Sequence, residues 1–158
     1  MQLSAVRSIG DEVVSISDVL CYQNQGLTER LMKQMFLDLP AANSLKEDML
    51  RFLYLCGSST FDERFAPPEI IDEAWHHFIL FTRDYDAFCK HYFGKFIHHS
   101  PNTSEKQVEP GLMKKTLSCA RQTFGELSLN WGASPDELSS GSCVSDCTQC
   151  SGSTNCQT

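Results

Sequence analysis

All five histidines of this 158-residue chain lie between residues 70 and 102, in the stretches EAWHHF, KHYF and FIHHSP. Asp72 and His76 are four residues apart, so on a helix their side chains extend from the same face. A carboxylate beside an imidazole either fixes the tautomer of the ring or shares a cation with it. We therefore predict a polar centre of Asp72, His76 and His98, with His99 as an alternate member, that can hold a divalent metal such as zinc or iron.

The two histidine pairs can meet only if the chain turns between them. In one unbroken helix from Glu69 to Phe93, Phe93 would lie ~25 Å beyond His76, whereas the five steps from Phe93 to His98 span at most ~17 Å. The sequence FTRDYD offers a break, because Thr82 is a competent N-cap for a second helix. We predict two helices that meet near Thr82; without that break, the histidines are separate surface or capping residues.

A second set of possible metal ligands is formed by four cysteines near the C-terminus. Their spacing is C-x3-C-x2-C-x5-C, and short loops between thiolates suit a tetrahedral zinc or an iron–sulfur cluster. We predict metal ligation by Cys143, Cys147, Cys150 and Cys156. The other four cysteines occur in or near apolar helical stretches and are expected to be small buried residues: Cys21, Cys56, Cys89 and Cys119.

The elements that must position these side chains have a helical period. Apolar residues recur at spacings of three and four, which predicts an all-α class and a compact helical bundle. Ser44 followed by Glu47 predicts the start of one helix, and Pro40 predicts the end of the helix before it. An apolar stripe over residues 113–124 predicts a further core helix, which Gly125 can terminate.

The composition changes near Trp131. Residues 133–158 contain seven Ser, three Thr and four Cys but no aromatic residue, Lys or Arg. So little apolar surface cannot offset the entropy of an ordered backbone. We predict a helical domain at residues 1–132 and a flexible tail at residues 133–158, ordered only by metal or modification and dispensable for folding of the domain.

Charge and motifs exclude several function classes. A net charge of -7 and a pI near 5.1 argue against nucleic acid or an anionic membrane surface as the main partner. No apolar run approaches the ~20 residues that span a bilayer, and the N-terminus lacks a secretory core, so we expect a cytoplasmic protein. Motifs of P-loop, dinucleotide, nucleophile-elbow and zinc-protease sites are absent from the sequence.

The segment around the histidines resembles the glycine-rich domain-containing protein family of bacteria and plants, over roughly residues 51–131. The shared motifs are Asp72 with Trp75-His76, Ile79-Leu80, Thr82, Tyr85, Cys89, Phe93-Gly94, and His98-His99 followed by Pro101. That family usually has a second histidine at the position of Phe78. The resemblance implies an important centre at Asp72, His76 and His98 and a Gly/Ser/Cys-rich tail, but it implies no particular reaction.

Three functions remain open from the sequence. We favour a small metal-binding helical module, not an enzyme, whose thiol-rich tail also binds metal. The second is a ribosomally made peptide precursor, in which a modifying enzyme or another protein partner acts on the Cys-rich tail. The third is a small metalloenzyme with an open site at Asp72, His76 and His98.

Overall fold

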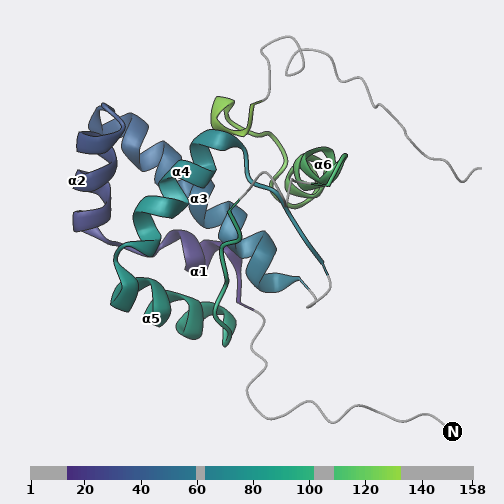
Figure 1. Cartoon of the computed structure of the whole chain (residues 1–158), viewed down its shortest axis with the longest axis horizontal. Coiled ribbons are helices and arrows are strands. Elements are labelled where there is room, and N and C mark those ends of the chain that lie inside the picture. Colours follow the sequence, from purple (N-terminus) through teal and green to yellow (C-terminus); the bar gives the residue numbers. More distant parts are fainter. Residues whose placement is uncertain (1–13, 60–62, 102–108, 133–158) are drawn as a thin grey trace, which may run out of the picture.

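The structure is a computed structural model that describes residues 14–59, 63–101 and 109–132. Within these ranges the chain forms six α-helices and a short 3-10 helix, with no strand, which confirms the predicted all-α fold (Figure 1). The elements are α1 (Ile16–Leu20), α2 (Gln25–Gln34), α3 (Leu39–Ser58), α4 (Glu69–Ile79), α5 (Thr82–Phe93), α6 (Leu112–Phe124) and the 3-10 helix η1 (Leu129–Trp131). The predicted tail at residues 133–158 lies outside the described residues.

Helix α3 is the centre of the fold and contacts each of the other helices and η1. Figure 1 shows it crossing the middle of the molecule, with α2 on one side and α6 on the other. Its apolar residues recur at helical spacing and are almost fully buried, and they pack against buried residues of α2, α4 and α5. These core residues include Leu27, Leu31, Leu45, Met49, Leu50, Phe52, Leu53, Ile71, Phe78, Tyr85 and Phe88.

Helix α3 begins six residues earlier than the sequence predicts. Asp38 is the N-cap, and its carboxylate accepts a hydrogen bond of 2.9 Å from the backbone N–H of Ala41. Asp caps a helix as well as Ser does. Because α3 already runs through Ser44, the start that the sequence predicts there is wrong. Pro40 lies in the first turn of α3, where the missing N–H removes no helical hydrogen bond, and it does not end the preceding helix as predicted.

Helix α2 instead ends at Gln34, through an unusual turn. Phe36 has a φ of 55°, and the N–H of Leu37 donates a hydrogen bond of 3.1 Å to the carbonyl of Met32. This pattern closes many helices, but the left-handed position is normally a glycine. Phe36 is 94% exposed, so few contacts of its ring offset the backbone strain.

The predicted break near Thr82 is present. Helix α4 ends at Ile79 and α5 begins at Thr82, but the N-cap is Phe81, so the expected capping role of Thr82 is wrong. The turn is closed by the backbone, since the N–H of Phe81 donates to the carbonyl of Phe78 at 3.0 Å. Gly94 ends α5 with a φ of 64°, a conformation that glycine adopts without steric cost.

A buried carboxylate fixes the C-terminal end of the described chain. Oδ1 of Asp48 accepts hydrogen bonds from the indole of Trp131 at 2.9 Å and from Arg51 at 2.8 Å. Oδ2 accepts from the hydroxyl of Ser128 at 2.6 Å and from the amide of Asn130 at 2.8 Å. Asp48 is fully buried in α3, so these contacts attach η1 to the central helix.

No helix in the described ranges combines the length and the apolar character needed to cross a membrane.

Candidate metal centre

Helix α4 supplies two members of the predicted centre. Pro67 and Pro68 precede the helix, and Asp72 stands in its acidic first turn, where a negative charge complements the helix dipole. Asp72 and His76 extend from one face, and Nε2 of His76 lies 3.7 Å from Oδ2 of Asp72. This confirms the side-chain placement that the four-residue spacing predicts.

The third member is His99, from the segment at residues 95–101 that follows α5. Its Nε2 lies 2.8 Å from Oδ1 of Asp72, and its ring centroid lies 4.3 Å from that of His76. One ligand atom from each of Asp72, His76 and His99 can be chosen so that all three lie within 4.8 Å of one another. This spacing suits three ligands of a single metal ion.

Two buried rings determine which histidine enters the centre. The indole N–H of Trp75 donates to the hydroxyl of Tyr85 at 2.9 Å, and that hydroxyl donates to the carbonyl of Ile97 at 2.6 Å. Burial raises the pKa of Tyr85 well above its usual value, so the phenol keeps the proton that it donates. With Ile97 fixed in this way, the ring of His99 packs edge-on against Trp75, at a centroid distance of 4.5 Å.

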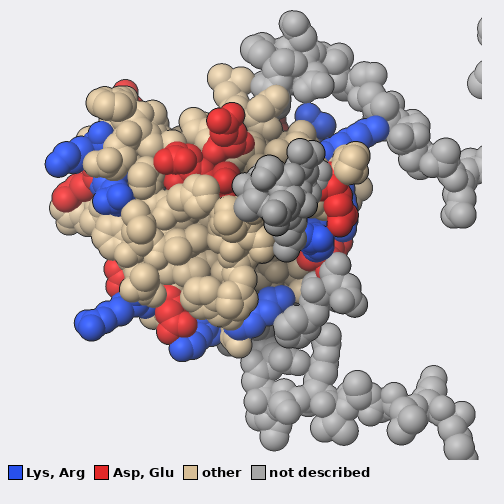
Figure 2. All heavy atoms as spheres, in the orientation of Figure 1, with Lys and Arg blue, Asp and Glu red and all other residues tan. Residues whose placement is uncertain are grey.

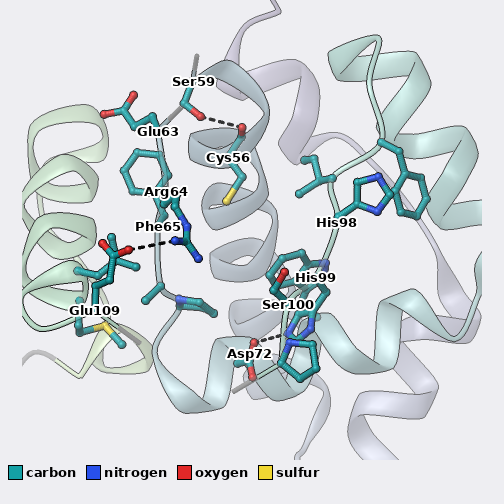
Figure 3. Close-up of a pocket in the computed structure, with 18 of the residues that line it drawn as sticks. Cys56, Ser59, Glu63, Arg64, Phe65, Asp72, His98, His99, Ser100 and Glu109 are labelled. Carbon is teal, nitrogen blue, oxygen red and sulfur yellow. Dashed lines mark hydrogen bonds and ion pairs between the residues drawn. The ribbon is translucent and has the colours of Figure 1, made fainter. Parts of the chain in front are cut away.

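His98, which we expected as the main third member, is outside this group of three. Its ring packs against Phe96 at a centroid distance of 4.8 Å, while His99 takes the place next to Asp72. Figure 3 shows the two rings directed away from each other. The physical reason is that neighbouring side chains of a non-helical segment point to different sides, so only one of an adjacent pair can face α4.

Glu73 contacts the ligand His76 from the outside of the centre, a role that the sequence did not predict. Its two carboxylate oxygens lie 3.7 Å from Nδ1 of His76 and 3.5 Å from Nε2 of His77. Nε of Arg30 donates to Nδ1 of His77 at 3.2 Å, so that nitrogen carries no proton. Burial, and then the charge of Arg30, lowers the pKa of His77. A carboxylate on the outer nitrogen of His76 leaves Nε2 directed towards Asp72, as in known histidine–metal sites.

The charge around the centre favours a cation. Figure 2 shows acidic side chains gathered over α4, the helix that carries Glu69, Asp72 and Glu73. The side chains of Asp72 and His76 are 32% and 42% exposed, whereas that of His99 is only 11% exposed. All three ligands are therefore partly buried, His99 the most, and the centre remains open to solvent on one side.

A family model described as UCP032817-like matches residues 19–126. The chain belongs to the UCP032817-like family. The match covers more than half of the chain and includes Asp72, His76 and His99. The resemblance to the glycine-rich domain-containing family is therefore wrong. It was based on short aromatic and histidine motifs, and Trp75 and Tyr85 of those motifs are buried packing residues that a helical core needs in any case.

Searches of curated proteins and of solved structures each found no match to this UCP032817-like chain. The family name states no activity, so a function must be argued from the site itself.

The cysteines of the helical domain differ in burial. Cys89 is buried as expected and Cys56 and Cys119 are partly buried, but Cys21, the C-cap of α1, is exposed, so the expectation is wrong for Cys21. Burial raises the pKa of Cys56 to about 12, so this thiol is protonated at neutral pH and is a poor metal ligand. The predicted ligands of the tail lie outside the described residues: Cys143, Cys147, Cys150 and Cys156.

Proposed function

We propose that this protein is a small metal-binding helical module that holds one divalent ion with Asp72, His76 and His99. The observation that carries the proposal is that ligand atoms from two separate chain segments lie within 4.8 Å of one another. The arrangement is also preorganised, because the Trp75–Tyr85–Ile97 hydrogen bonds fix the segment that carries His99. A metal ion would replace the direct contact between His99 and Asp72.

The donor set narrows the choice of ion to zinc or iron. Two imidazole nitrogens and one carboxylate oxygen can form a tetrahedral zinc site with water as fourth ligand. The same three donors with open positions are also typical of non-haem iron(II) centres. We propose a cytoplasmic location, where Cys143, Cys147, Cys150 and Cys156 would stay reduced and bind a second ion in the tail.

Zinc binding by full-length protein tests the proposal. Equilibrium dialysis at neutral pH should show one site that survives replacement of the four tail cysteines by serine. In that background, His76→Ala should weaken zinc binding by at least ~10-fold, and acid should release the ion as the imidazoles are protonated. His91→Ala is the matched control, because His91 lies on α5 and packs against Tyr92. Equal zinc binding by the His76→Ala variant and its parent would contradict the proposal.

A small metalloenzyme is the second candidate function. The observation that favours it is a cavity that Asp72 and His99 border directly, so that a bound molecule would reach the open side of the metal. Three protein ligands also leave at least one coordination position for water or a substrate.

A further inference from the structure

The cavity beside the centre has a volume of about 760 Å³ and lies between α3, α4, the start of α6 and the segments before α4 and after α5 (Figure 3). Ligand pockets for small organic molecules have volumes of roughly 300–1,000 Å³, so the size is suitable. Most of its wall is apolar and is contributed by Phe65, Pro67, Trp75, Phe96, Leu112 and Met113. Such a wall favours a ligand with an apolar body.

Two cations border the same cavity. Figure 3 shows Arg64 extending from the segment before α4 towards the interior of the cavity. Its Nη1 contacts Glu109 at 3.0 Å, but both side chains are more than half exposed, and exposed pairs of this kind contribute little. A guanidinium has five N–H donors in a fork that matches a carboxylate, so a ligand can share it with Glu109 or displace that residue. Lys95 is the second cation, and its ammonium donates to the carbonyl of Ser59 at 3.0 Å.

Four carboxylates border the cavity, those of Glu63, Glu69, Asp72 and Glu109, and two of them, Glu63 and Glu109, pair with a lysine or arginine. Glu63 lies 3.4 Å from Lys115, and Asp72 lies 2.8 Å from His99. An anion that takes the place of Glu109 would meet its most favourable partner at Arg64 and, when a metal is bound, a second positive charge at the edge formed by Asp72 and His99.

We propose that this cavity binds a small monocarboxylic acid with an apolar body. Its carboxylate pairs with Arg64, and its body lies against the apolar wall between Phe65 and Met113. The inference depends on the proposed function at one point only, the presence of a metal at the edge of the bound acid. Cys56 also borders the cavity, but its protonated thiol supplies no nucleophile, so the interaction is non-covalent binding.

Calorimetric titration of the full-length protein tests this inference, with octanoate and 3-phenylpropionate as probes and 1-octanol as the uncharged control. Both acids should bind to metal-free protein, and more tightly than the alcohol. Arg64→Gln should weaken binding of the acids by at least ~10-fold and leave the alcohol unchanged, because only the acids use the guanidinium. Met113 is partly exposed, so a Met113→Trp side chain can fill part of the cavity, and this variant should bind all three probes more weakly.

Arg83→Gln is the matched control, because Arg83 is exposed on α5 and does not border the cavity. Absence of binding by both acids to the parent protein, or unchanged binding by the Arg64→Gln variant, would overturn the inference. Titration with zinc in parallel separates the two proposals. Acid binding by a protein that fails to bind zinc would refute only the metal centre, and zinc binding without acid binding would refute only the cavity ligand.

Discussion

Removal of the carboxylate of Asp48 should destabilise the whole domain. In the Asp48→Ala variant, the buried indole N–H of Trp131 loses its acceptor, which costs about 1–3 kcal/mol. The hydroxyl of Ser128 and the amide of Asn130 lose charge-assisted hydrogen bonds, and Arg51 loses its partner at 2.8 Å. These losses are not additive, because one group accepts them all, so we expect a total of about 3–5 kcal/mol.

Urea unfolding followed by far-UV circular dichroism measures this loss. In thermal unfolding, at about 3–5 °C per kcal/mol for a domain of this size, the melting temperature should fall by about 10–25 °C. Asp86→Ala is the matched control, since it also removes an aspartate from a helix, but one whose pair with Lys90 is exposed. The control should lie within about 0.5 kcal/mol of the parent. A loss below about 1 kcal/mol for Asp48→Ala would refute the argument that this carboxylate attaches η1 to α3.

Three further changes test other parts of the fold. Phe36→Gly should raise the free energy of unfolding by about 1 kcal/mol, because glycine relieves the strain of the left-handed backbone at an exposed position; a decrease in urea unfolding would contradict this. Gly57→Ala should lower the free energy of unfolding by about 1–3 kcal/mol, because the added methyl group would overlap the ring of Phe93, and the same change should cost less in a Phe93→Ala background, which lacks the overlapping Cγ and Cδ atoms. His77 has a lowered pKa when folded, so its stabilising contribution is present above its unfolded pKa of about 6.5 and is lost as the pH falls below that value. Relative to His77→Gln, the parent should therefore lose stability between about pH 7.5 and 5.5, and a constant difference across this range would exclude a lowered pKa.

Local rules predict much of the fold because they describe short stretches of chain. The helical period, the break near Thr82 and the end of α6 at Gly125 all follow from residues a few positions apart. The predicted boundaries around Pro40 and Ser44 are wrong because local rules do not include contacts with the rest of the fold. Several residues there are competent caps, and packing of the whole of α3 against its neighbours selects Asp38.

The candidate site is less predictable because tertiary contacts choose its members. The sequence identifies Asp72 and His76 by spacing alone, but it does not distinguish His98 from His99. That choice depends on the hydrogen bond from Tyr85 to the carbonyl of Ile97, which fixes the side of the segment that faces α4. Asp48 was missed for a similar reason, since three of its four donors lie 80 or more residues away in the sequence.

Zinc affinity of two neighbouring variants, His99→Ala and His98→Ala, tests the central proposal most directly. Both variants remove one imidazole from the same segment, so they are matched in chemistry and in position. In the background without tail cysteines, calorimetric titration should show at least ~10-fold weaker zinc binding for His99→Ala and an affinity within ~2-fold of the parent for His98→Ala. Equal affinities of the two variants, or a larger loss for His98→Ala, would contradict a metal centre formed by Asp72, His76 and His99.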